Sequence, residues 1–161
     1  MSEEDDDYGL SPTKEIVEID APVVDYRPQV PKSYRPKIAM IGTGGISEFH
    51  LKAYRKCGYE VAAFASRTRS KAEARRDEFY PEAEVYDDFA PILERDDIEV
   101  LDITPHPADR LPIVKEALKA GKHVLSQKPF VLDLDEGEEL VSLAQERSEE
   151  HTSELQSPVT I

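Results

Sequence analysis

A glycine-rich turn between two apolar runs constrains the fold of this chain more than any other feature. The stretch from Lys37 to Ser66 reads KIAMIGTGGISEFHLKAYRKCGYEVAAFAS. An apolar run is followed by a Gly-Thr-Gly-Gly turn, a helical pattern and a second apolar run. Strand, turn, helix and strand form a βαβ unit, whose turn and helix N-terminus can bind the phosphates of a dinucleotide.

The residues of this turn have separate physical roles. Gly42 permits a tight turn out of the strand, and Gly44 lets the backbone approach a pyrophosphate with no Cβ in the way. Ser47 stands where such turns often carry a third glycine, and its small side chain still allows close helix–strand packing. The cofactor-binding candidates here are Gly42, Thr43, Gly44, Gly45 and Ile46. The alternative is a tight βα turn that binds no ligand.

The helix after the turn carries apolar residues at helical spacing. Ile46, Phe49, Ala53 and Cys57 are predicted to form its inner face, which makes Cys57 a buried thiol. Cys57 is also the only cysteine. An intramolecular disulfide is therefore impossible, and a reducing compartment, the cytoplasm, is expected.

Strands and helices are predicted to alternate along the rest of the chain. After Ser66 the pattern predicts a helix over 67–80, a strand over 84–86, a short helix around 89–93, and a strand over 98–104. A helix capped by Asp109 with Pro112 in its first turn, a strand over 122–126, and a helix begun by an Asp133–Glu136 capping box follow. This alternation predicts an α/β fold, a Rossmann-type doubly wound parallel sheet of five strands in the order 3-2-1-4-5. Its ligand is expected at the carboxyl ends of strands 1 and 4.

Charge and composition exclude some function classes. The 161 residues carry a formal net charge of −14, which disfavours binding to nucleic acid or to an anionic membrane surface. No apolar run is long enough to span a bilayer. Residues 1–36 are acidic and rich in proline, and they are interpreted as a leader that is disordered or forms an extended arm over the domain. Residues 37–146 then form the folded domain.

The end of the second predicted strand bears on the choice of cofactor. A carboxylate usually binds the ribose 2′-hydroxyl at this place, but the chain has Ser66, Arg67 and Thr68 there. Hydroxyl and guanidinium groups suit a 2′-phosphate, so NADP is favoured over NAD. An ordinary basic first turn of an exposed helix is the alternative.

Two further loops are expected at the same edge of the sheet. Thr104, Pro105 and His106 follow the central strand, and Gln127, Lys128 and Pro129 follow the fifth; these six are further cofactor-binding candidates. Lys128 at such a cleft can bind a substrate hydroxyl or take part in proton transfer. No metal site is predicted, and His50 and His123 are interpreted as structural.

Three stretches in order, IGTGGISEFHLKAY, LDITPHPADR and ALKAGKHVLSQKPF, resemble the glucose–fructose oxidoreductase, inositol dehydrogenase and MocA (Gfo/Idh/MocA) family. The resemblance covers roughly Lys37 to Glu146. It implies an NAD(P)-dependent oxidoreductase acting on sugar or polyol hydroxyls, with Lys128 as the catalytic lysine of a Glu-Lys-Pro motif in which Gln127 replaces the glutamate. It also implies that Arg110 stands where a histidine is common. The family continues into a second, substrate-binding domain that supports homo-oligomers, and this domain is expected to be absent here. The fragment alone is therefore expected to bind cofactor weakly and to catalyse little.

Two alternatives to an oxidoreductase stay open. In a non-catalytic dinucleotide-binding sensor, Gln127 would mark lost chemistry. A methyltransferase would use the glycine turn for a nucleoside cofactor, but it favours an acid after the second strand, where Ser66 stands.

The C-terminal stretch, residues 147–161, is interpreted as having a different origin from the rest of the chain. Arg147 to Ser157 reads RSEEHTSELQS, which is the translation of a DNA string that resembles a common sequencing adapter. Residues 147–161 are therefore expected to be a non-native tail and are excluded from fold reasoning.

Overall fold

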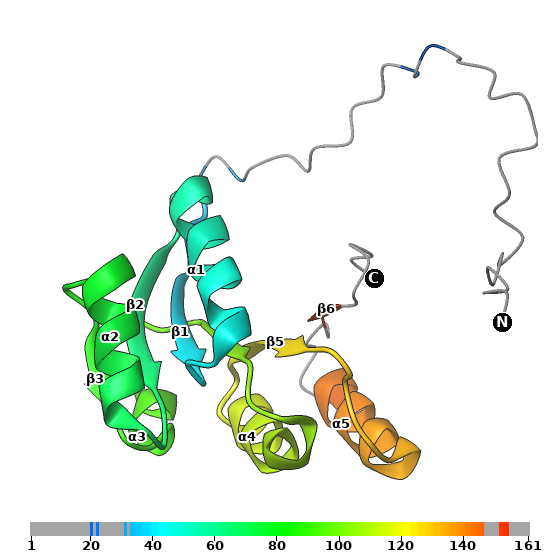
Figure 1. Ribbon diagram of the computed structural model, residues 1–161. Helices are drawn as coiled ribbons and strands as arrows, with labels where there is room; N and C mark the ends of the chain where they lie inside the picture. The colour runs from blue at the N-terminus through cyan, green and yellow to red at the C-terminus, as the bar shows by residue number, and fades with distance from the viewer. Residues whose placement is uncertain (1–19, 21, 23–30, 32, 147–151, 155–161) are drawn as a thin grey trace, which may run out of the picture.

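Six parallel strands form one sheet in the order β3-β2-β1-β4-β5-β6. The computed structural model describes residues 20, 22, 31, 33–146 and 152–154 (Figure 1). The strands are β1 (Lys37–Ile41), β2 (Glu60–Ala65), β3 (Glu84–Tyr86), β4 (Val100–Ile103), β5 (His123–Gln127) and β6 (Thr152–Glu154). The five predicted strands all form in the predicted order, which confirms the α/β Rossmann-type fold.

Helices cover both faces of the sheet (Figure 1). One face packs against α1 (Gly45–Cys57) and α2 (Arg69–Phe79). The other packs against α3 (Ala90–Leu93), α4 (Pro107–Lys119) and α5 (Leu134–Glu146). None of these helices, in the part of the chain that the structure describes, is long and apolar enough to cross a membrane.

The central strand β1 shows why the sequence forms a sheet buried on both faces. Its alternate residues Ile38 and Met40 belong to the core under α1 and α2, whereas Ala39 and Ile41 belong to the core under α4 and α5. All four are at most 4% exposed. A strand covered on both sides must be apolar throughout, which is the continuous run that the sequence carries.

A sixth strand lies where an unpaired edge of the sheet was expected. β6 pairs in parallel with β5, with Leu125 opposite Thr152 and Gln127 opposite Glu154. The predicted order 3-2-1-4-5 puts the fifth strand at the edge of the sheet, whereas β6 covers that edge in the structure. Strand pairing uses backbone N–H and C=O groups, so an extended segment of almost any sequence can cover such an edge.

The inner face of α1 differs from the predicted one. The predicted residues Ile46, Phe49, Ala53 and Cys57 are all exposed, with Phe49 at 68%, and the prediction of a buried thiol is wrong. The buried residues of the helix are Ser47, His50 and Leu51. The buried face carries two polar side chains that make hydrogen bonds, so a search for apolar periodicity selected the wrong face of the helix.

The start of α4 also differs from the prediction. The helix begins at Pro107 and is capped by His106, whose Nδ1 accepts a hydrogen bond from the Ala108 N–H at 3.3 Å. Asp109 is therefore not the cap, and Pro112 lies inside the helix and not in its first turn. Proline at the first helical position is favourable because its missing N–H would have no partner there.

The last residues of the N-terminal leader contact the domain. Tyr34 donates a hydrogen bond to Glu99 at 2.7 Å. The guanidinium of Arg35 donates to the Cys57 carbonyl at 3.0 Å and lies 5.3 Å from the centroid of the Tyr59 ring. Tyr34 and Arg35 thus contact the domain, and the arrangement of the leader over 1–36 stays a prediction. Most of 1–32, together with 147–151 and 155–161, lies outside the described residues.

Candidate functional site

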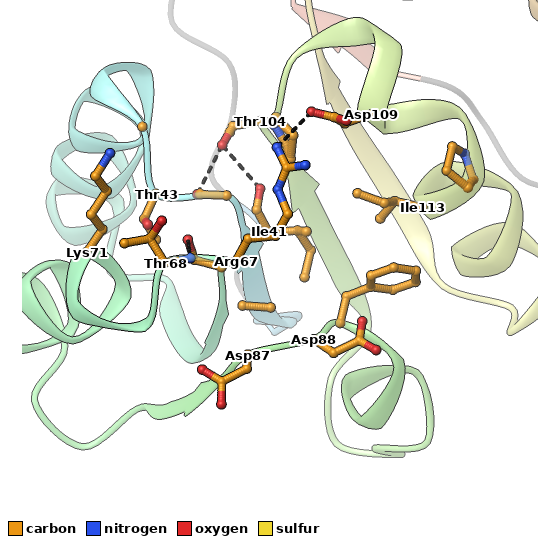
Figure 2. A pocket seen from close by; sticks show the side chains of 17 residues that line it. Ile41, Thr43, Arg67, Thr68, Lys71, Asp87, Asp88, Thr104, Asp109 and Ile113 are labelled. Carbon is orange, nitrogen blue, oxygen red and sulfur yellow. Dashed lines mark hydrogen bonds and ion pairs between the residues drawn. The ribbon is translucent and has the colours of Figure 1, made fainter.

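A cavity of about 450 Å³ opens at the carboxyl edge of the sheet (Figure 2). It lies between the glycine turn after β1, the loop after β2, the residues that follow β3, and the β4–α4 loop. Eight of the predicted cofactor-binding residues line it: Gly42, Thr43, Gly44, Ser66, Arg67, Thr68, Thr104 and Pro105. The expected position of the ligand, at the ends of strands 1 and 4, thus coincides with a cavity.

Gly42 is required by the protein itself. Its φ is +89°, in the region that favours glycine, and an added Cβ would lie 2.8 Å from Thr104 Oγ1 and 2.9 Å from Pro105 Cδ. Thr104 Oγ1 donates toward the carbonyls of Ile41 and Gly42, at 3.1 and 3.0 Å (Figure 2). The tight turn and the Thr-Pro loop therefore fix each other.

Gly44 is different, because no protein atom lies within 4 Å of the position of an added Cβ. Gly44 lines the main cavity and, with Gly45 and Lys71, a second cavity of about 330 Å³ beside the start of α1. The side chain of Thr43 in the same turn is buried, and its Oγ1 has no hydrogen-bond partner among the described residues. Open space, an unpaired hydroxyl and a helix N-terminus without a side-chain cap together fit a phosphate ligand.

The predicted 2′-phosphate residues lie on the β2 side of the cavity. Ser66 Oγ accepts a hydrogen bond from the Thr68 N–H at 3.2 Å. Arg67 is 84% exposed and reaches across to α4, where its guanidinium pairs with Asp109 at 2.9 Å (Figure 2). Lys71, in the first turn of α2, also lines the cavity, whereas Arg69 pairs with Glu73 and Asp87.

Two carboxylates that the sequence reasoning missed line the cavity from the end of β3. Asp87 pairs with Arg69 at 3.2 Å, and Asp88 accepts a hydrogen bond from the Ala90 N–H at 3.3 Å. Their place directly after a short parallel strand was the available signal, since the carboxyl ends of parallel strands meet at one edge. Both acids already have partners in the protein.

The remaining predicted residues line neither cavity. Ile46 is 38% exposed on α1, and His106 is exposed and caps α4. Gln127 ends β5, beside β4, and Lys128 follows it, half-buried and joined to Pro129 by a cis peptide bond. Their contacts with a cofactor or substrate stay predictions.

A buried polar network connects α1, β4 and β5 behind this edge. Asp102, fully buried in β4, accepts hydrogen bonds on Oδ2 from His50 Nδ1 and from the Tyr54 hydroxyl, each at 2.7 Å. His50 Nε2 lies 3.2 Å from Gln127 Nε2. The sequence carried a signal for Asp102, since a carboxylate inside a buried apolar strand needs hydrogen-bonding partners.

Arg110 is a second buried polar residue that the sequence reasoning did not place. It is 1% exposed, and its guanidinium donates to Ser126 Oγ at 3.1 Å and to the Pro129 carbonyl. Burial lowers the pKa of Arg110 from its ordinary value. Its spacing of three and four from Ile113 and Val114 put it on the inner face of α4.

Comparison with known proteins identifies the family. Residues 36–153 match the profile of the Gfo/Idh/MocA family, described as an oxidoreductase family with an NAD-binding Rossmann fold. The chain belongs to this family. It contains the family's NAD(P)-binding Rossmann domain, and the resemblance that the three motifs carried is confirmed.

The relatives of this family member include enzymes with sugar-like substrates. An oxidoreductase of Schizosaccharomyces pombe is 31% identical over 70% of this chain and 31% of its own length. Inositol 2-dehydrogenase of Salmonella typhimurium is 31% identical over 60% of this chain and 29% of its own length. The chain thus spans about a third of the length of the curated relatives it matches.

Solved structures agree with the fold. A 3-ketoreductase from Actinomadura kijaniata, in complex with NADP and TDP-benzene, superimposes with a TM-score of 0.67 at 31% identity. The match covers 74% of this chain and 37% of that protein.

Proposed function

We propose that this chain forms the cofactor-binding domain of an oxidoreductase that prefers NADP and acts on a hydroxyl of a sugar-like or polyol substrate. The observation that carries this proposal is the composition of the cavity wall at the end of β2. Ser66, Arg67, Thr68 and Lys71 line it, and the carboxylate that would bind a ribose 2′-hydroxyl there is missing. The NADP in the related 3-ketoreductase structure supports the same preference.

The residues of this chain would hold the cofactor in two halves. The glycine turn and the start of α1 would bind the pyrophosphate, and the β2–α2 loop would bind the adenosine end. The nicotinamide end would then extend toward the ends of β4 and β5, where Thr104 and Lys128 lie. When bound, the nicotinamide supplies the group that accepts or delivers hydride.

Lys128 is proposed to handle the proton of the substrate hydroxyl. Its ammonium makes no hydrogen bond or ion pair with any residue in the described part of the chain, and its side chain is half-buried at the edge of the sheet. A lysine in this position can donate to a substrate oxygen or exchange a proton with it. The inositol dehydrogenase and the 3-ketoreductase among the relatives support a substrate rich in hydroxyl or keto groups.

The setting of the protein forms a further part of the proposal. A small-molecule substrate and a homo-oligomeric intact protein follow from the family. A reducing compartment, the cytoplasm, suits a chain whose single cysteine, Cys57, is exposed.

A titration of the purified chain with NADPH and with NADH, each followed by calorimetry, tests the cofactor preference. NADPH is expected to bind more tightly, and Arg67→Ala is expected to remove most of that difference, because the guanidinium supplies charge-assisted hydrogen bonds to the 2′-phosphate. Arg76→Ala, on α2 and outside the cavity lining, serves as the matched control. The proposal is contradicted if neither NADPH nor NADH binds.

The second candidate function is a dinucleotide sensor without catalysis, which Gln127 favours because it stands where the family usually has glutamate. Tight NADPH binding combined with no turnover in a protein that carries a complete substrate domain would support the sensor. Turnover of a polyol or sugar by such a protein would support the enzyme.

A further inference from the structure

The backbone on both sides of Lys128 is held by buried side chains. The Lys128 N–H donates to Gln127 Oε1 at 2.7 Å. The carbonyl of the following residue, Pro129, accepts a hydrogen bond from Arg110. Gln127 and Arg110 are 7% and 1% exposed. Since an exposed loop could leave these groups to water, the use of two buried polar side chains indicates that this segment is held in one position.

Gln127 is itself held through a chain of hydrogen bonds that ends deep in the sheet. Its Nε2 lies 3.2 Å from His50 Nε2, and His50 Nδ1 lies 2.7 Å from Asp102 Oδ2. The Tyr54 hydroxyl donates to the same carboxylate oxygen. His50, Asp102 and Gln127 are each at most 7% exposed, so water does not compete for these contacts.

The direction of each hydrogen bond in this chain follows from the first one. Because Gln127 Oε1 accepts from the Lys128 N–H, the amide NH₂ is the group that faces His50. An NH₂ group only donates, so His50 Nε2 must accept and carries no proton. The single ring proton then lies on Nδ1 and is donated to the Asp102 carboxylate.

We infer that Asp102, His50 and Gln127 form a relay of positioning residues that places Lys128, and that Gln127 selects the neutral Nδ1–H tautomer of His50. Arg110 holds the segment after Lys128 through its hydrogen bond to the Pro129 carbonyl. The inference rests on the proposed function for the role of Lys128, but the tautomer of His50 follows from the contacts alone. On this reading Gln127 holds the lysine in place of the family's glutamate, and it does not mark lost chemistry.

A carboxylate at position 127 would change the protonation of the relay. It could accept from the Lys128 N–H, but toward His50 it would present only an acceptor. When that carboxylate is ionised, pairing with it requires a proton on Nε2 as well as on Nδ1, which gives an imidazolium between two carboxylates, Asp102 and the introduced one. Asp102, Tyr54 and Gln127 are among the groups that face the ring.

The tautomer is tested by long-range ¹H–¹⁵N NMR of the full chain labelled at histidine, without cofactor, at neutral pH. In the wild type, His50 is expected to show an unprotonated Nε2 and a protonated Nδ1. Gln127→Glu is expected to show protons on both nitrogens, while Gln145→Glu, the same change at an exposed site on α5, leaves the ring neutral. A wild-type proton on Nε2, or a neutral His50 ring in Gln127→Glu, overturns the inference.

The positioning role is tested by amide hydrogen exchange. Gln127→Ala and His50→Ala are expected to speed exchange at the Lys128 amide roughly fivefold or more, the factor for loss of a hydrogen bond of about 1 kcal/mol. The Thr104 and Gly42 amides, which donate to the Ile41 and Ala65 carbonyls, serve as internal controls and should keep their protection. Unchanged Lys128 exchange, or equal acceleration at all three amides, overturns the role.

A parallel NADPH titration of the same samples separates this inference from the proposed function. Gln127→Ala is expected to weaken NADPH binding less than Gly44→Ala does, because Gly44 lines the cavity proposed for the phosphates and Gln127 does not. If the wild type does not bind NADPH, the proposed function is contradicted, whereas the result for the tautomer of His50 is unaffected. Loss of binding in Gln127→Ala alone contradicts the relay as a device that acts on Lys128.

Discussion

Gly42 and Gly44 stand two positions apart in one turn, yet different partners require them to be glycine. At Gly42 the backbone φ of +89° and the contacts with Thr104 and Pro105 leave no room for a side chain. At Gly44 the φ of −73° suits any residue, and nothing in the protein lies within 4 Å of an added Cβ. No protein contact requires glycine at the second position, which suits close approach of a phosphate to the N-cap of α1.

The two glycines therefore give opposite predictions when each is changed to alanine. Gly42→Ala is expected to lower the free energy of unfolding by at least about 1–3 kcal/mol, through backbone strain and the displaced Thr-Pro loop. Gly44→Ala is expected to leave stability within about 0.5 kcal/mol of the wild type but to weaken NADPH binding about tenfold. Urea unfolding and calorimetry measure the two effects. A destabilised Gly44→Ala with unchanged affinity would show that the turn serves only the fold.

Asp109 lies close to the place where the proposed 2′-phosphate would sit. It is the ion-pair partner of Arg67, and both side chains are substantially exposed, at 41% and 84%. An exposed pair of this kind is worth about 0.2–1 kcal/mol, so it opposes a phosphate only mildly.

Asp109→Asn is consequently expected to raise NADPH affinity by about 1.5- to 5-fold, because Arg67 no longer has to leave a carboxylate. NADH affinity should change less, since that nucleotide lacks the 2′-phosphate. Comparison of both affinities at low and high salt measures the effect, which should shrink as salt screens the charges. An equal gain for both nucleotides would argue against a phosphate beside Arg67.

At the scale of elements, helix α1 has a buried face that depends on its polar residues. Leu51 is fully buried between the helix and the sheet, and its neighbours on that face are Ser47, His50 and Tyr54. Ser47 occupies the position of the usual third glycine, where it is fully buried and its hydroxyl donates to the Gly44 carbonyl at 2.6 Å. Close packing of helix and strand is therefore retained with serine.

This face of α1 is tested by two substitutions of apolar residues by alanine. Leu51→Ala is expected to lower the free energy of unfolding by about 2–5 kcal/mol, because it leaves a cavity in the core. Phe49→Ala, at a site 68% exposed, should change it by no more than about 0.5 kcal/mol. Denaturant unfolding measures both. A larger loss of stability for Phe49→Ala than for Leu51→Ala would support the helix face that apolar periodicity predicted.

The strands were more predictable than the helix faces, for a physical reason. β1, β2 and β4 are covered on both sides by helices, so each is largely apolar and stands out in the sequence, and the buried Asp102 of β4 is tolerated because it is hydrogen-bonded. A helix touches the sheet along one stripe only, and in α1 that stripe includes His50, whose polarity is satisfied by Asp102. A pattern of apolar residues cannot reveal a buried face of that kind.

At the scale of the whole molecule, Tyr80 links the end of α2 to the residue before β2. Its hydroxyl donates to the Tyr59 carbonyl at 3.0 Å, and burial raises the pKa of Tyr80 to about 12 from an ordinary 10.0. The unfolded chain loses this proton near pH 10 and the folded one near pH 12. Unfolding therefore becomes easier as the pH rises through this window.

Tyr80→Phe is expected to make the free energy of unfolding fall less steeply between pH 10 and pH 12 than it does in the wild type. The difference should be below about 1 kcal/mol, since solvent screens a partly exposed group. Chemical denaturation at a series of pH values measures it. Identical pH profiles for the two proteins would place the ionisation of Tyr80 at the same pH in both states.

The sequence by itself determined the α/β class, the strand order, the family and most of the wall of the cavity. These features depend on local rules: apolar runs form buried strands, a glycine turn joins strand to helix, and parallel strands present their ends at one edge. Only the tertiary structure decided which face of α1 is buried, that Arg67 pairs with Asp109, and that Asp102, His50 and Gln127 meet behind Lys128. Those contacts join residues 42 to 77 positions apart, and a polar side chain carries no local sign of the distant partner that allows it to be buried.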